Sequence, residues 1–376
     1  MDIQQYVAQL KEQYKLLLEF LEDDVEIDEY INISKKFDAI KQKKNREELV
    51  SFLLLLLNIL DNHARKNKLF QKTKKIILYF SHEIKQTLSN SEIFDIFKGN
   101  KLIILFLLKN QIITPDKFVT DFILSYPDYC HFFSPEIGLK TDDYSQDHNF
   151  EEKRQIGQND SYICSLIRSD LIDDFVAYVS QTNLPISDIK IKPSIFETNS
   201  FLIDKHPTLI EYSAFFGSIQ IFNFLRLNKV ELTSSLWLYA IHSNNAELIH
   251  LLEANNVKPD DITYEECLFE SIKCHHNGVA NYIRNNFLII NGNSEQKICF
   301  LESLFSISLH YYNYSFFPNN VNQPFLFFYL CQYNHYYIVN LLMELKKNDI
   351  ESQIVLKKNC FSFEIFNIIV FNSIYF

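Results

Sequence analysis

The segment TLIEYSAFFGSIQIFNFL, residues 208–225, contains two short helical patterns that meet at Gly217. Its second half, GSIQIFNFLRLNKV, recurs 27 residues later as NNAELIHLLEANNV, which begins at Asn244. Further copies are HHNGVANYIRNNFL from His275, NHYYIVNLLMELKK from Asn334 and, earlier, DLIDDFVAYVSQTN from Asp170. In each copy, residues three positions apart mark one mostly apolar face of a helix. The recurrence predicts a helical element that is repeated along the chain.

The first residue of each copy indicates how the repeated helix begins. Gly tolerates a positive φ, and Asn, Asp and His are the other residues most enriched there. A left-handed residue that ends one helix just before another begins makes a tight helical hairpin. The residues four positions earlier are small or apolar: Leu166, Ser213, Ala240, Ser271 and Leu330. Such hairpins bury both faces only by stacking, so the sequence predicts an all-α solenoid of helical hairpins.

The segment 208–225 also resembles the ankyrin pattern. Thr208, Ser213, Ala214 and Gly217 occupy its marked positions, whereas Leu209 and Glu211 replace the usual Pro and His. SIFETNSFLI, TLIEYSAFFGSIQIF, SLWLYAIHSNNAELIHLLE and ESIKCHHN together resemble a domain of unknown function found with ankyrin repeats in a large protozoan protein family. This resemblance covers about residues 160–290. It implies an ankyrin-like fold and no established activity.

The chain is expected to divide into three segments. Residues 1–150 form an N-terminal helical domain, 160–290 the ankyrin-like repeats, and 291–376 degenerate repeats. Expected N-terminal helices cover 46–63, 69–89, 91–98, 100–112 and 115–125, the last with Thr114 as cap and Pro115 at its first position. The polar residues 140–160 are expected to form a loop. The apolar tail CFSFEIFNIIVFNSIYF replaces the usual polar cap, so either the chain is truncated or the tail is covered.

The first helix has a narrow apolar stripe, formed by Ile3, Val7, Leu10, Tyr14, Leu17 and Leu21. This 3-4 spacing fits a helix that packs on its own domain. Self-association of the chain through the same stripe is the alternative.

Composition narrows the class of protein. The only glycines are 6 isolated residues, which excludes the Gly-rich loops that hold nucleotide phosphates. The 7 cysteines form no C-x-x-C pair, which is typical of free thiols in the cytoplasm or nucleus. The longest apolar run, Phe52–Leu57, is too short for a membrane span.

No set of residues has the spacing of a catalytic or metal site. Gln86 stands where the sequence beginning His82-Glu83 would need a second zinc-binding His, so His82 is interpreted as a surface residue. The adjacent residues Cys274, His275 and His276 diverge and are not expected to share a metal. The pairs Asp173/Asp174 and Asp260/Asp261 are interpreted as caps or solvated loops, and Trp237 as core. We therefore expect no enzyme, cofactor, metal or small-molecule substrate.

These features favour a non-catalytic scaffold that binds another protein. In an ankyrin-like array the concave face is formed by hairpin tips and the ends of the first helices. The candidates are the residues just before each turn residue. One of Phe215 and Phe216 is expected to pack and the other to be exposed as an anchor. The alternative is that both are buried against a neighbouring repeat. The six partner-binding candidates are Arg168, Phe215, Phe216, His242, Lys273 and Tyr333.

The alternative is nucleic-acid binding through residues 35–75. This stretch has 12 Lys/Arg against 4 Asp/Glu, although the whole chain has a net charge of −11. The global charge disfavours phosphate binding, and the local excess keeps the alternative open.

Overall fold

The computed structural model describes residues 3–22, 45–62, 67–139, 149–203, 205–288, 294–317 and 324–345. Every regular element in these ranges is a helix, as expected, and the only β-type pairing in them is one isolated bridge between Lys190 and Thr208. Contacts divide the chain into two compact units. Unit 1 contains residues 1–56 and 290–376, and unit 2 contains residues 57–289. The expected N-terminal segment 1–150 therefore contributes residues to both units.

Unit 1 is built from helices that lie far apart in the sequence. They are α1 (Ile3–Glu22), the first part of α3 (Arg46–Asn62), α21 (Ser294–His310), the 3₁₀ helix η2 (Tyr314–Phe316), α22 (Pro324–Gln332) and α23 (Tyr336–Leu345). The apolar stripe of α1 faces η2 and α23, and Leu17 is completely buried. Tyr14 lies edge-on to Tyr314, and Lys11 Nζ donates to the carbonyl of Phe317 at 3.0 Å. The stripe thus packs within its own unit.

The first helices of unit 2 depart from the sequence expectation at several points. They are α4 (Asn67–Tyr79), α5 (Ser81–Thr87), α6 (Asn90–Phe97), α7 (Lys101–Lys109), α8 (Lys117–Ser125), α9 (Pro127–Phe132) and α11 (Phe150–Ile156). The expected helix 69–89 is broken at the buried Phe80, whose ψ of 3° leaves the helical region. Thr114 is not the cap of α8, because the Asp116 side chain accepts from the amide of Val119 at 3.0 Å. Within the expected loop 140–160, α11 forms, and residues 140–148 lie outside the described ranges.

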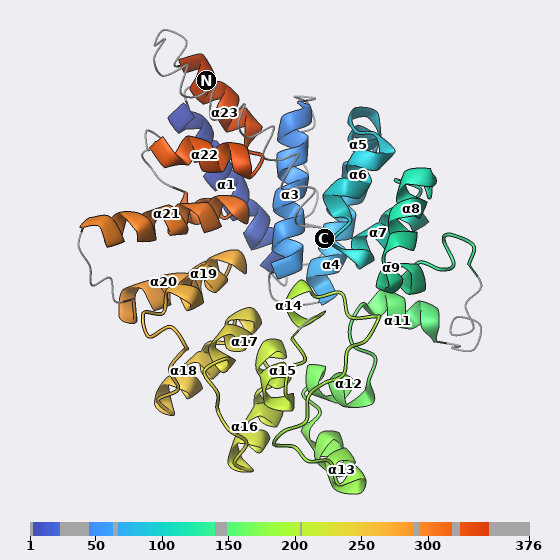
Figure 1. Ribbon diagram of the computed structural model, residues 1–376, viewed down its shortest axis with the longest axis vertical. Helices are drawn as coiled ribbons and strands as arrows, with labels where there is room; N and C mark the ends of the chain where they lie inside the picture. Colours follow the sequence, from blue (N-terminus) through green and yellow to red (C-terminus); the bar gives the residue numbers. More distant parts are fainter. Residues whose placement is uncertain are drawn as a thin grey trace. The chain divides into compact units, whose positions relative to one another are not determined.

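The rest of unit 2 is a series of helical hairpins that follow one another in chain order (Figure 1). They are α12 (Tyr162–Arg168) with α13 (Ile172–Thr182), α15 (Leu209–Phe216) with α16 (Ile219–Leu227), α17 (Leu236–Ser243) with α18 (Ala246–Ala254), and α19 (Glu265–Lys273) with α20 (Asn277–Asn286). Each first helix packs on the next, α12 on α15, α15 on α17 and α17 on α19. The short helix α14 (Ser200–Ile203) lies in the segment 184–207 between the first two hairpins.

All five predicted turn residues have a positive φ: Asp170 49°, Gly217 71°, Asn244 53°, His275 59° and Asn334 63°. At Gly217 the turn is closed by a bond from its amide to Ala214 and by one from Ser218 to Ser213. This pair of bonds defines the Schellman motif. The residues four positions before the turns are all buried, so the predicted hairpin register is confirmed.

Side chains also link neighbouring hairpin tips. Ser218 Oγ donates to the carbonyl of Ile167 at 2.5 Å. The Asp170 carboxylate accepts from the amides of Gln220 and Ile221 at 3.1 and 3.0 Å, and so caps the first turn of α16. Side chains at and beside the turns therefore fix the second hairpin against the first.

Trp237 is completely buried, as predicted, and its indole Nε1 donates to the carbonyl of Val257 at 2.8 Å. In the described ranges, no helix combines the length and apolar content that a bilayer crossing requires.

Candidate functional site

A pocket of about 470 Å³ lies beside α12, the first helix of the first hairpin. Ser165, Arg168 and Ser169 of this hairpin form one wall, so the pocket includes the first pair of predicted ridge residues. The remaining lining combines apolar side chains with amides and one carboxylate: Leu60, Leu69, Phe70, Gln71, Asn100, Leu102, Glu152, Gln155, Ile156 and Gln158. Apolar walls with a few polar groups are typical of sites that bind a ligand or a side chain.

Arg168 is held in this wall by contacts to two parts of the chain. Its Nη1 donates to the carbonyl of Asn159 at 2.7 Å and to the hydroxyl of Tyr212 at 3.0 Å. Burial is the main cause that raises the pKa of Tyr212 above its ordinary value, so its hydroxyl stays neutral. A guanidinium has five N–H donors, and the half-buried Arg168 keeps the capacity to bind an acceptor in the pocket.

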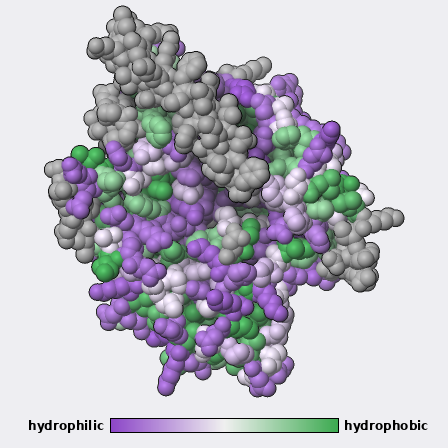
Figure 2. Space-filling view, in the orientation of Figure 1, coloured by the Kyte–Doolittle hydropathy of each residue, from purple (hydrophilic) through white to green (hydrophobic). Residues whose placement is uncertain are grey.

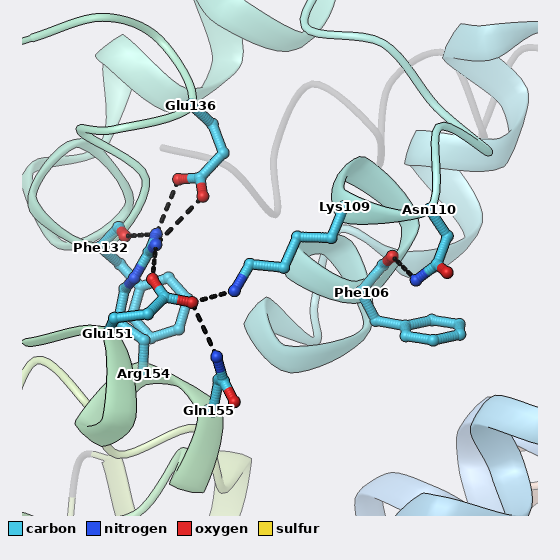
Figure 3. Close-up of polar contacts among 8 residues, drawn as sticks. All are labelled: Phe106, Lys109, Asn110, Phe132, Glu136, Glu151, Arg154 and Gln155. Atoms are coloured by element: carbon cyan, nitrogen blue, oxygen red, sulfur yellow. Dashed lines mark hydrogen bonds and ion pairs between the residues drawn. The ribbon is translucent and has the colours of Figure 1, made fainter.

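Helix α11, which contributes another part of the pocket lining, is held by its buried residue Arg154 (Figure 3). Arg154 Nη1 donates to the carbonyl of Phe132 at 2.8 Å, and the guanidinium forms two bonds to Glu136, of 2.7 and 3.1 Å. Glu151 accepts from Arg154, from Lys109 and, at 2.9 Å, from Gln155. Paired charges of this kind fix geometry, because breaking a buried pair leaves an uncompensated charge. The network thus holds α11, which contributes Glu152, Gln155 and Ile156 to the pocket.

The predicted aromatic pair sits at the end of α15. Phe215 is buried, with 4% of its surface exposed, and Phe216 is half-buried. The Phe216 ring lies 4.7 Å from that of Tyr212 and 5.0 Å from that of Phe215. The pair therefore divides as predicted into a packed residue and a more accessible one.

Phe201 of α14 covers the next two ridge positions. Its ring stacks on Phe215 at 5.7 Å, lies 4.0 Å from the imidazole of His242 and meets Tyr239 edge-on at 5.1 Å. Phe215 and His242 are consequently buried under a segment of the chain itself. The repeat pattern does not predict this cover, because the segment 184–207 has no counterpart in the other repeats.

A polar cluster lies beneath Phe201 and joins α17 to α19. His242 Nε2 and Glu270 Oε1 are 2.7 Å apart, and Lys273 Nζ lies 3.1 Å from the same carboxylate oxygen. Burial opposes ionisation of Glu270, but the bond and charge of His242, with the ammonium of Lys273, lower its pKa from 4.5 to about 2. The sulfur of the buried Cys274 lies 3.5 Å from His242 Nδ1. Burial, followed by the charge of Glu270, raises the pKa of Cys274 well above its ordinary value, so this thiol is not an activated nucleophile.

Tyr333, the last predicted ridge residue, belongs to unit 1. Its hydroxyl bonds to Ser306 at 2.9 Å, its ring stacks on His310 at 4.7 Å, and its carbonyl accepts from Tyr312 at 2.8 Å. Of the six candidates, three thus lie close to the ring of Phe201: Phe215, His242 and Lys273. Arg168 and Phe216 both contact Tyr212.

Residues that the sequence placed outside any site occupy ordinary positions. His82 is exposed, and Asp173 and Asp174 are exposed in the first turn of α13. Asp261 Oδ2 accepts from the amide of Glu266 at 2.8 Å, next to the start of α19. The interpretation of these acids as caps or solvated residues agrees with the structure.

No protein-family model matches the chain, and neither a curated protein nor a solved structure matches it.

Proposed function

We propose that the chain is a non-catalytic, intracellular scaffold that binds another protein through the ridge formed by its stacked hairpins. The main support for this proposal is the series of hairpins, which have left-handed turn residues and first helices that pack on one another. An ankyrin-like solenoid presents this ridge on its concave face, and repeat arrays of this kind supply extended binding surfaces. The resemblance over residues 160–290 supports the same interpretation.

The binding surface is best assigned to the pocket beside α12 together with Phe216. The pocket borders the first hairpin and Phe216 lies on the second, and the two are linked through Arg168 and Tyr212. The view in Figure 2 shows a mainly hydrophilic surface over the hairpins with separate apolar patches. A surface of this kind fits an interface in which a few buried anchors dominate the affinity. The fitting partner segment has an apolar side chain for the pocket and an adjacent carboxylate for Arg168.

The test starts from affinity capture with the full chain, followed by cross-linking to locate the contact and by titration with the purified partner. We expect cross-links near α12 and α15, and an affinity that falls about tenfold or more in Phe216→Ala. Ser169→Trp, which fills the pocket, is expected to act similarly. The matched control is Ser180→Trp, at an exposed position of the second helix α13. Equal affinity of all three variants, or cross-links confined to other regions, would contradict this assignment.

The structure does not favour the nucleic-acid alternative. In the described part of the basic segment, Lys72 is buried and Lys74 Nζ lies 4.2 Å from the ring centre of Phe70. Burial and the charge of Lys109 also lower the pKa of Lys74. Binding of nucleic acid with an affinity that falls steeply as salt is added would favour the nucleic-acid alternative instead.

A further inference from the structure

Three side chains of metal-ligand type converge beneath Phe201. They are His242 on α17, Glu270 on α19 and Cys274 at the C-terminal cap of α19. One ligand atom from each lies within 4.8 Å of the other two. Glu270 and Cys274 are four positions apart, so one face of α19 presents both, and the neighbouring hairpin supplies the imidazole. The sequence does not reveal this set, because the partners of Cys274 are His242 and Glu270 and not the adjacent His275 and His276.

The nitrogen–sulfur separation is close to that of a tetrahedral centre, whereas the nitrogen–oxygen separation is shorter. A Zn–N bond of about 2.0–2.1 Å and a Zn–S bond of about 2.3 Å place nitrogen and sulfur about 3.6 Å apart. The Cys274 sulfur lies 3.5 Å from Nδ1 and 3.7 Å from Nε2 of His242. The contact of 2.7 Å between Nε2 and Glu270 Oε1 is a hydrogen bond, and it would have to widen by about 0.7 Å for both atoms to bind one ion.

The ligand types select the metal. Magnesium and calcium take oxygen ligands, whereas a thiolate, an imidazole and a carboxylate together suit zinc. Lys273 Nζ, 3.1 Å from Glu270 Oε1, would act as an outer partner that orients the ligating carboxylate.

We propose that His242, Glu270 and Cys274 bind one structural zinc ion that joins the hairpin α17–α18 to the hairpin α19–α20. On binding, the Cys274 thiol and the His242 Nε2–H that bonds to Glu270 each release a proton to solvent, and the sulfur and the nitrogen then bind the ion. A water molecule completes the four ligands. Three protein ligands and one water are also the pattern of catalytic zinc sites. Here Cys274 is fully buried and Phe201 covers His242, so the ion would be shielded from substrates, and we assign it a structural role.

The experiment uses the full chain after removal of metal with a chelator. Zinc is titrated in competition with a chromophoric chelator, and cobalt is then substituted to report the ligands. We expect one zinc per chain, a thiolate-to-cobalt charge-transfer band, and a higher melting temperature with zinc. Cys274→Ser should abolish that band and weaken zinc binding by about 100-fold or more. Cys267→Ser is the matched control, because Cys267 is equally buried on the same helix and outside the cluster.

Two results would overturn the zinc site. One is a folded wild-type chain that binds no stoichiometric zinc or shows no thiolate band with cobalt. The other is equal zinc affinity of Cys274→Ser and Cys267→Ser. If Cys274→Ser fails to fold, Glu270→Gln, which keeps the shape of the side chain, must weaken binding at least about tenfold. Since no partner is present in these measurements, their outcome is independent of the proposed scaffold function.

Discussion

Gly217 shows how a single backbone angle sets the hairpin register. Its φ of 71° suits glycine and is strained for a β-branched residue. A Cβ at this position would meet Ser243 at 3.5 Å, an ordinary contact, so the cost of substitution comes from the backbone. We expect Gly217→Val to lower the free energy of unfolding by about 1–3 kcal/mol in chemical denaturation.

The matched control is Gly278→Val in α20, where a Cβ meets nothing within 4 Å and φ is not positive. Its effect should stay within about 0.5 kcal/mol, because valine is at least as good a helix former as glycine. Equal losses of stability at both positions would show that a side chain at Gly217 adds no backbone strain.

Phe215 and Phe216 separate folding from binding. Truncation of the buried Phe215 to Ala should cost about 3–5 kcal/mol of stability through lost burial and a cavity. Phe216→Ala should cost clearly less, because its ring is half-buried, and should weaken partner binding instead. Denaturant unfolding and partner titration of both variants check this division. An equal loss of stability in Phe216→Ala and Phe215→Ala would contradict this division of roles.

At the scale of one element, α1 tests packing against self-association. Leu17 is fully buried in unit 1 and Leu10 is half-buried beside Ser51 and Tyr314, so a carboxylate is costly at both positions. We expect Leu10→Glu and Leu17→Glu together to lower the melting temperature and leave the mass in light scattering unchanged. The exposed Gln5→Glu is the control. A wild-type dimer that these two changes convert to a monomer would contradict packing within the unit.

Element boundaries mark where sequence reasoning succeeded and failed. The turns at Asp170, Gly217 and Asn244 could be predicted because the signal is local and recurs. Thr114 followed by Pro115 matches the pattern of a cap and first helical residue, yet α8 begins two residues later with Asp116 as its cap. The backbone of Thr114 instead bonds to the side chain of Asn90, a tertiary contact that the local pattern does not show. The cover by Phe201 and the cluster of His242 with Glu270 and Cys274 depend on contacts between distant segments, so neither repeat spacing nor propensity reveals them.

The two units of the molecule are expected to respond differently to acid. Burial lowers the pKa of His335, in unit 1, from 6.5 to about 4, despite its bond to the carbonyl of Leu309. Between these values the unfolded chain binds the proton and the folded chain does not, so stability falls as pH falls. The pKa of Glu270 in unit 2 is lowered from 4.5 to about 2, and its contribution is lost only below pH 4.5.

From pH 6.5 to 4.5, unit 1 should therefore lose about 2–3 kcal/mol through His335, and unit 2 nothing through Glu270. In the metal-free chain, hydrogen exchange measured by mass spectrometry should report faster exchange in α21–α23 and little change in α17–α19. His335→Gln should remove this difference, whereas Glu270→Gln should preserve it. Equal loss of protection in both units would contradict the assignment to His335.

Because of the segment 184–207, the hairpins differ in the length of chain that each would release under a pulling force. The turn residues Asp170, Gly217, Asn244 and His275 are spaced 47, 27 and 31 positions apart. A pulling force that peels hairpins one at a time would release about 160 Å of chain for the first interval and about 90 and 105 Å for the others. Because Phe201 in the long interval stacks on Phe215 and lies against His242, that release also uncovers the ends of α15 and α17. Tension along the chain would thus expose buried side chains in its longest extension step.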